Sequence, residues 1–327
     1  MNNKLIIIVG IAGVAALSIL KYINNKIDNK IDNKIVAPYT SLIEVIEDTA
    51  TLRNNIGQQL YSSKNHADVL QRATDIKGKI FIIGNLLINR TIILDKMTTF
   101  EGLMDSKAVD PISSIKADKI FNGTEMFKTN YKFVKKTSDL NTYIYFKNIT
   151  LLGNKTINGL DLTNIDTMRF ENSKIAFCKK CIITDYYGQL NELGHINGAL
   201  MPGGLWVTNS LIYGIDINIE IKYVTQCWFT NNWFIGMGYN TCVRMVGVNK
   251  VKFMANEFNY PTNEVFILED DSIRPITDVI AESNLYICSS SKVVTNLLSP
   301  DINYSKRIYI EGLAIDGKYD NCIRCYT

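Results

Sequence analysis

The chain has 327 residues, of which 46% are hydrophobic and 20% charged, and its formal net charge is only +3. This apolar composition excludes an intrinsically disordered chain, and the length suffices for one large domain or two ordinary ones. The small net charge argues against a nucleic-acid-binding protein, so we expect no nucleic-acid partner.

The first expected element is a hydrophobic anchor over residues 1–23, because an apolar run begins at Leu5 and extends to Ile23. A helix that spans a bilayer needs about 20 such residues. The competing interpretation is a cleaved signal peptide with Lys4 as its basic start. Residues 5–23 therefore predict a membrane partner and a single-pass protein. The β-fold expected for the rest of the chain leads us to expect a body that is extracellular or on a virion surface. The lysines after the run favour the opposite orientation, so the topology stays open.

Residues 24–64 are expected to form a helical stalk. Isoleucines recur every fourth residue from Ile23 to Ile35, which lays them along one helical stripe. Ser41 to Glu44 match a capping box that opens a second amphipathic helix, extending to about Ser62. The stalk is expected either to pack on the body or to join copies of the chain into a homo-oligomer such as a trimer.

A third short helix is expected from about Asn65 to Asp75, with Val69 and Leu70 on its apolar face and Gly78 as its stop. Residues 65–78 would cap the N-terminal end of a β-domain that occupies residues 65–327. From Lys79 onward the pattern changes to short runs rich in isoleucine and phenylalanine, which are typical of strands.

A seven-residue segment then recurs seven times, with an apolar second residue and a small or Asn pair at its fourth and fifth positions. The copies, which we call the repeat segments, are YFKNITL from Tyr145, RFENSKI from Arg169, WVTNSLI from Trp206, WFTNNWF from Trp228, KFMANEF from Lys252, IAESNLY from Ile280 and YIEGLAI from Tyr309. Their starts lie 22 to 37 residues apart. A unit of this length holds three short strands and three turns but cannot bury its apolar face alone, so the units must stack.

This pattern predicts an all-β solenoid, a right-handed parallel β-helix that follows the N-terminal transmembrane and stalk region. The second residue of each repeat segment should point inward; these residues are Phe146, Phe170, Val207, Phe229, Phe253, Ala281 and Ile310. Asparagine suits the turns because it tolerates the left-handed conformation and forms hydrogen-bonded ladders between stacked coils.

The chain here resembles the pectate-lyase-like superfamily of right-handed parallel β-helix proteins. The resemblance is carried by the stretch from about Ala67 to Leu103, which includes GKIFIIGNLLINRTIILDKMTTFEGL, and by the Asn-bearing coils that continue to Tyr326. It implies a fold but no single function, because the superfamily includes polysaccharide lyases and hydrolases, phage tailspikes, adhesins and structural proteins.

Catalytic candidates are few. The resemblance to polygalacturonases implies Asn-Thr-Asp, Gly-Asp-Asp, His-Gly and Arg-Ile-Lys motifs, of which only Asp270-Asp271 is similar to the second. His195, in a glycine-rich excursion between coils, is the candidate base. A lyase would need Ca²⁺, and we expect no cofactor otherwise. The two CxxC pairs lie too far apart for an ordinary zinc module, so no metal site is expected.

The first positions of the repeat segments form one outward column, which contains Tyr145, Arg169, Trp206, Trp228 and Lys252. In a continuous register, the two tryptophans lie about 5 Å apart beside two cations. Exposed aromatic rings next to cations suit the stacking of sugars or a protein interface. The alternative is that a loop or the helix expected over residues 41–62 covers them.

We therefore expect a membrane-anchored surface or virion protein that attaches to a glycan or a surface protein without catalysis. Two alternatives remain open: a polysaccharide lyase or glycoside hydrolase with a divergent acidic site, and a purely structural scaffold.

Overall fold

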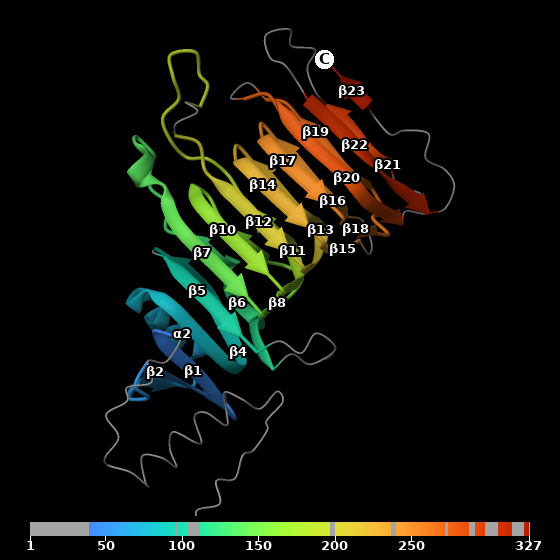
Figure 1. Cartoon of the computed structure of the whole chain (residues 1–327). Coiled ribbons are helices and arrows are strands. Elements are labelled where there is room, and N and C mark those ends of the chain that lie inside the picture. The colour runs from blue at the N-terminus through green and yellow to red at the C-terminus, as the bar shows by residue number, and fades with distance from the viewer. Residues whose placement is uncertain are drawn as a thin grey trace, which may run out of the picture.

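The strands of this chain pair mainly in parallel, coil upon coil, along one axis that runs from β1 at one end to β22 at the other (Figure 1). The computed structural model describes residues 39–95, 97–103, 112–196, 200–236, 240–271, 274–287, 292–297, 307–315 and 324–326. Each coil contributes a strand to each of three parallel faces, so the fold is a parallel β-helix.

The first face contains β4 (Gly78–Leu94), β5 (Thr98–Gly102), β7 (Asn141–Lys147), β10 (Ile165–Glu171), β12 (Gly204–Thr208), β14 (Thr225–Thr230), β17 (Asn249–Met254), β20 (Asp278–Ile287) and β22 (Arg307–Ile315). The second face adds β6 (Ser113–Thr129), β8 (Thr150–Leu152), β11 (Lys174–Ile183), β13 (Leu211–Lys222), β15 (Trp233–Ile235) and β18 (Glu257–Asn259). The third face adds β9 (Asn158–Asp161), β16 (Thr241–Val246), β19 (Glu264–Glu269) and β21 (Lys292–Leu297). The longer strands, such as β4, bend from one face to the next. A 3₁₀ turn (Thr137–Asp139) precedes β7, and β23 (Arg324–Tyr326) pairs antiparallel with β22.

The predicted register of the repeat segments is confirmed. Phe170 pairs with Phe146 on one side and with Val207 on the other, and Phe253 pairs with Phe229 and Ala281 in the same way. The inward residues of all seven repeat segments are buried. The seven segments are therefore neighbouring rungs of one ladder.

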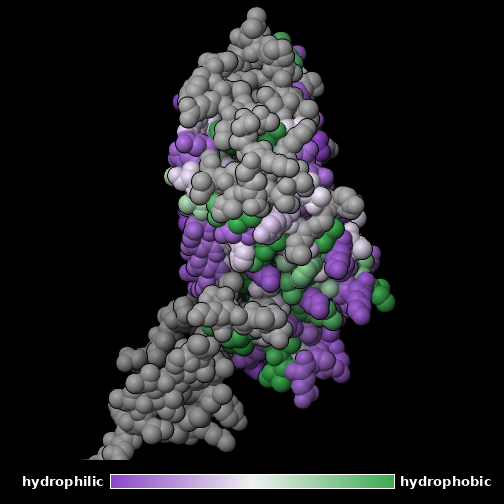
Figure 2. All heavy atoms as spheres, turned by 90° about the vertical axis from the view of Figure 1, so that its right-hand side faces the viewer, coloured by the Kyte–Doolittle hydropathy of each residue, from purple (hydrophilic) through white to green (hydrophobic). Residues whose placement is uncertain are grey.

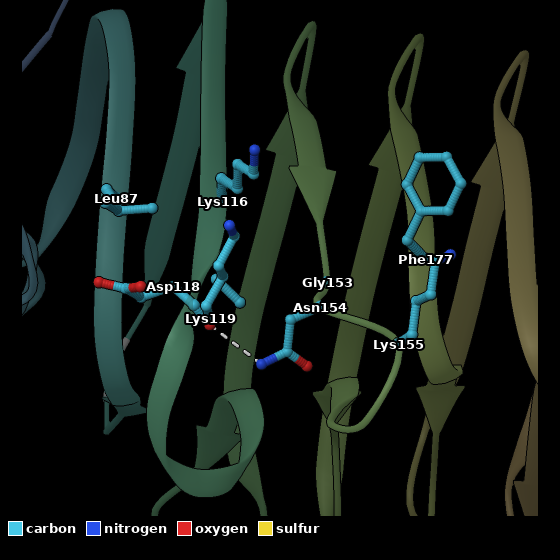
Figure 3. A pocket seen from close by; sticks show the side chains of 9 residues that line it. Leu87, Lys116, Asp118, Lys119, Gly153, Asn154, Lys155 and Phe177 are labelled. Carbon is cyan, nitrogen blue, oxygen red and sulfur yellow. Dashed lines mark hydrogen bonds between the residues drawn. The ribbon is translucent and has the colours of Figure 1, made fainter.

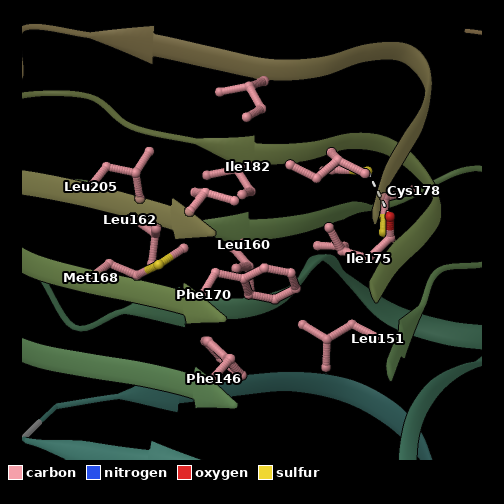
Figure 4. Close-up of a cluster of buried hydrophobic side chains, with 14 of the residues drawn as sticks. Phe146, Leu151, Leu160, Leu162, Met168, Phe170, Ile175, Cys178, Ile182 and Leu205 are labelled. Carbon is pink, nitrogen blue, oxygen red and sulfur yellow. Dashed lines mark hydrogen bonds between the residues drawn. The ribbon is translucent and has the colours of Figure 1, made fainter. Parts of the chain in front are cut away.

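The interior of the solenoid is filled by stacked side chains, part of which Figure 4 shows around Phe146 and Phe170. The rings of Phe229 and Phe253 stack with centroids 4.5 Å apart. Cysteines also lie in this interior; those described are Cys178, Cys181, Cys227 and Cys242, and all four are buried. Burial raises the pKa of Cys181, so this thiol stays protonated and packs as a small apolar side chain.

Asparagines build the turns between the first and second faces, as the sequence predicted. The first turn residue adopts a left-handed conformation, with φ of 55° at Asn231. The second is buried and forms a ladder: the side-chain nitrogen of Asn232 donates to Oδ1 of Asn256 at 3.0 Å, and that of Asn256 donates to Oδ1 of Asn284 at 3.0 Å. These bonds satisfy buried polar groups and fix the register of neighbouring coils.

The expected cap helix is confirmed as α2 (His66–Ile76), whose Val69, Leu70 and Ala73 are buried. It packs against β4 and against the short strands that precede it.

The helix predicted over residues 41–62 is wrong. This segment forms three strands, β1 (Ser41–Ile46), β2 (Thr49–Asn54) and β3 (Gln59–Ser63), joined as an antiparallel meander. The reason is long-range pairing, because β1 lies parallel to β4, with Ser41 opposite Ile80. Turn residues at Glu47 and Gly57, both with positive φ, interrupt any helix.

The predicted localisation as a single-pass membrane protein is corrected. Within the part of the chain that the structure describes, no helix is both long and apolar enough to cross a membrane. The apolar segment 5–23, on which that prediction depended, and the stalk residues 24–38 lie outside the described residues.

Candidate functional site

The outward column of the first face contains the predicted ligand-binding side chains next to one another. Arg169 pairs with Tyr145 and with Trp206, and Trp228 pairs with Trp206 and with Lys252. Alternate residues of a strand point to opposite faces, so these five side chains point outward while their neighbours fill the core. We call this surface, together with Tyr143, the tryptophan face.

The two indole rings of the tryptophan face stack in parallel. Their centroids lie 5.4 Å apart, their planes differ by 5°, and both residues are half-buried. The ring of Trp206 lies over Gly204, where a Cβ atom would come within 2.4 Å of the ring. Gly204 is therefore needed for this orientation. Because each ring covers the other, the pair presents a ridge of indole edges to solvent.

A cation and two tyrosines extend this ridge. The guanidinium of Arg169 lies 5.7 Å from the ring of Trp206 and 5.9 Å from that of Tyr143, within the range of cation–π attraction. The rings of Tyr143 and Tyr145 meet edge to face at 6.0 Å. Sequence reasoning missed Tyr143, although its position two residues before Tyr145 placed it on the same side of the strand.

The tyrosines and a carboxylate add polar groups to the tryptophan face. The hydroxyl of Tyr145 donates a hydrogen bond to Glu171. Burial, and then this hydrogen bond to the carboxylate, raise the pKa of Tyr145 well above its ordinary value, so the phenol stays protonated. Burial also raises the pKa of Tyr143.

Cations of the third face are paired with carboxylates. Arg244 bridges Glu220 at 3.2 Å and Glu269 at 2.6 Å, and Lys180 also pairs with Glu220, which forms an ionic ladder across the coils. Among the described residues, by contrast, no ion pair links Arg169 or Lys252 to a carboxylate. Their charges are therefore available to a ligand.

The predicted catalytic residues lie elsewhere. Asp270 accepts a hydrogen bond from the backbone N–H of Ile276 at 2.7 Å, and Asp271 accepts one from the hydroxyl of Tyr223, so both help to hold the loop after β19. His195 lies in the long loop between β11 and β12, where its backbone N–H donates to Asn191 at 2.9 Å. The structure therefore does not bring His195 and the two aspartates into a bonded group.

Three further aspartates, which lie in different coils, each have a lysine beside them. The shortest N–O distances are 3.8 Å for Asp161 to Lys128, 3.9 Å for Asp185 to Lys222 and 4.0 Å for Asp216 to Lys179. Burial raises the pKa of Asp185. Over the described ranges, no cluster of three or more His, Cys, Asp or Glu side chains has the arrangement that a metal ion needs.

On the face shown in Figure 2, hydrophilic and hydrophobic side chains are interspersed over the described surface. Large apolar side chains are exposed on several elements, among them Trp233, which is 46% exposed on β15. Because Trp233 belongs to the second face, it offers a tryptophan outside the tryptophan face for comparison.

No protein-family model and no curated protein matches the chain. The N-terminal fragment of gene product 12 of bacteriophage Phi29 is similar in structure, with 11% identity and a TM-score of 0.46 over 76% of this chain and 44% of that fragment. The surface protein and adhesin PfbA of Streptococcus pneumoniae has 10% identity and a TM-score of 0.42 over 77% of this chain and 82% of its own. The tailspike protein of Acinetobacter phage vB_ApiP_P1 has 17% identity and a TM-score of 0.37 over 78% of this chain and 57% of its own.

The chain thus spans about half the length of the two phage proteins. The parallel β-helix itself is established by the strand pairing of this chain.

Proposed function

We propose that this chain is a surface or virion attachment protein that binds glycans through the tryptophan face without cleaving them. The observation that carries this proposal is the stacked pair of Trp206 and Trp228, with the guanidinium of Arg169 at 5.7 Å from the first ring. The exposed indole edges offer apolar contact area to a sugar, while the neighbouring cations donate hydrogen bonds to its oxygens.

The shape of the tryptophan face favours a glycan over a small, compact ligand. Its residues lie on consecutive parallel strands, which are spaced by about 4.8 Å along the axis of the solenoid. A linear ligand that lies along this axis would meet one side chain of the column about every 4.8 Å. The interior stacking of each rung holds them in place, so little conformational entropy is lost on binding.

The test is a glycan-array screen with the full chain, run beside an assay for the release of reducing sugar. We expect binding without release, and we expect the double variant Trp206→Ala/Trp228→Ala to lose roughly tenfold or more in affinity. Trp233→Ala is the matched control, because it removes an exposed tryptophan from another face.

Two outcomes would contradict the proposal. Release of sugar from a bound glycan would favour the alternative of a polysaccharide lyase or glycoside hydrolase. Failure to bind any glycan, or equal losses in the control and the double variant, would favour a structural scaffold.

A further inference from the structure

An open cavity of about 540 Å³ lies on the second face, between the coils of β4 and β11. Figure 3 shows the side chains of Lys116 and Lys119, Asn154 and Phe177 around it. Lys155 and Asp118 complete its polar wall. The volume falls in the range of small-molecule sites, which is roughly 300–1,000 Å³.

The backbone around the cavity is fixed by the stacking of coils. The N–H of Gly153 donates to the carbonyl of Ala176 at 2.8 Å, and the N–H of Lys155 donates to the carbonyl of Phe177 at 2.6 Å. The side-chain nitrogen of Asn154 donates to the carbonyl of Asp118 at 3.0 Å, which ties this loop to β6. The wall of the cavity is therefore rigid before any ligand binds.

Charge is the most unusual property of this cavity. Three lysines and one aspartate line it, and all three lysines are exposed. Other lysines on the solenoid, such as Lys79 and Lys180, pair with carboxylates. Among the described residues, however, no ion pair involves Lys116, Lys119 or Lys155. The cavity therefore attracts anions.

The cavity also has an apolar rim. Phe177 is 37% exposed and its ring lies 5.2 Å from that of Tyr213, while Leu87 is 45% exposed on the other side. Phe177 has a φ of 59°, a conformation that is uncommon for a bulky residue. An aromatic ring beside unpaired ammonium groups matches a ligand with an apolar ring face and a negative charge better than it matches a bare anion.

We propose that this cavity binds an anionic sugar residue, one that carries a carboxylate or a phosphate, with Lys116 and Lys119 at the charged group, and with Phe177 and the neighbouring Lys155 against the sugar ring. This site lies on the second face and does not depend on the function proposed for the first.

The test measures binding to the full chain by calorimetry, with glucuronic acid against glucose and glucose 6-phosphate against glucose. The two pairs separate a carboxylate from a phosphate as the source of the charge. We expect at least one anionic sugar to bind about tenfold or more tightly than its neutral counterpart, with an affinity that falls as salt rises.

Substitutions assign the binding to the cavity. Lys116→Gln/Lys119→Gln should lower the affinity by about tenfold or more, whereas Lys135→Gln/Lys136→Gln, which removes two exposed lysines elsewhere, should leave it unchanged. Phe177→Asn keeps a residue that tolerates positive φ but removes the ring, so it should weaken the binding of the sugar without unfolding the chain.

Three results would overturn the proposal: no preference for either anionic sugar over its neutral counterpart, equal losses in the two lysine variants, or binding of inorganic phosphate as tight as that of glucose 6-phosphate. Trp206→Ala/Trp228→Ala should bind the anionic sugar like the parent. A loss in that variant would move the site to the tryptophan face and also overturn the proposal.

Discussion

Asn256 lies in the turn between β17 and β18, where its buried amide connects three coils. Its Oδ1 accepts from the backbone N–H of Asn232 at 2.9 Å, and its side-chain nitrogen donates to the carbonyl of Phe229 at 2.9 Å and to Asn284 at 3.0 Å. Through these buried hydrogen bonds, the asparagine in the turn contributes directly to the stacking of neighbouring coils.

Asn256→Ala is therefore expected to destabilise the protein by about 2–4 kcal/mol, because it leaves a buried N–H and a buried carbonyl without partners. Urea unfolding of the full chain measures this. Asn231→Gly is the matched control: it lies in the preceding turn, is exposed and keeps the positive φ, so it should change stability by less than about 0.5 kcal/mol. Equal effects in the two variants would show that the ladder contributes nothing special.

The buried thiol of Cys227 makes the free energy of unfolding depend on pH in the alkaline range. Burial raises the pKa of Cys227 to about 12, whereas a thiol in the unfolded chain ionises near ~8.5. Between these values the folded protein keeps its proton and the unfolded chain loses it. The unfolded state then binds fewer protons, so the free energy of unfolding falls as pH rises.

Unfolding by urea at pH 8 and pH 10 should show a fall in stability that is about 1–2 kcal/mol larger for the parent than for Cys227→Ala. The cavity left by this substitution lowers stability at both pH values and cancels in the difference. An identical fall in the two proteins would mean that the thiol titrates normally in the folded state.

At the scale of elements, the sequence predicted the coils well because their pattern recurs. Seven segments share the apolar second position, and six of them carry an asparagine at the turn, so each segment supports the alignment of the others. The pairing of Phe146 with Phe170 and of Phe253 with Ala281 follows this alignment. Residues 41–62 had no such repetition. Their apolar spacing also fits a helix, and the partner that decides for a strand, Ile80 opposite Ser41, lies far along the chain.

The same limit applies to the candidate sites. The tryptophan face was predictable because its members occupy one position of the repeat segments. The cavity on the second face was not, because most of its lining residues lie in loops or bulges of different coils, such as the loop that contains Asn154 and the bulge at Phe177. Nothing in the repeat specifies where such irregular residues meet.

Substitutions at Leu52 and Ile56 can distinguish the observed N-terminal strands from the helix that the sequence pattern predicted. Both lie on the apolar stripe of that helix, but Leu52 is 1% exposed in β2 and Ile56 is 67% exposed in the following turn. Leu52→Ala should therefore lower the free energy of unfolding by about 2–4 kcal/mol. Ile56→Ala should change it by less than about 0.5 kcal/mol, and comparable losses would instead support the helix.

At the scale of the whole molecule, the solenoid is a linear array in which each coil contacts mainly the coils before and after it. The tryptophan face and the lysine-lined cavity lie on different faces of this array, and each is built from a few neighbouring coils. The strand pairing of its own face holds each site in place, so a substitution in one site should leave the other intact.

This architecture predicts how core substitutions combine. Phe229 and Phe253 stack at 4.5 Å on adjacent rungs, whereas Phe100 lies on β5, several rungs away. In a double-mutant cycle measured by urea unfolding, Phe229→Leu and Phe253→Leu should show a coupling of about 0.5–3 kcal/mol, because each loses part of its contact when the other changes. Phe100→Leu and Phe253→Leu should add to within about 0.5 kcal/mol. Leucine retains most of the volume, so each variant should still fold. Strong coupling between the distant pair would contradict a nearest-neighbour solenoid, because strain would then pass through rungs that do not touch either substituted ring.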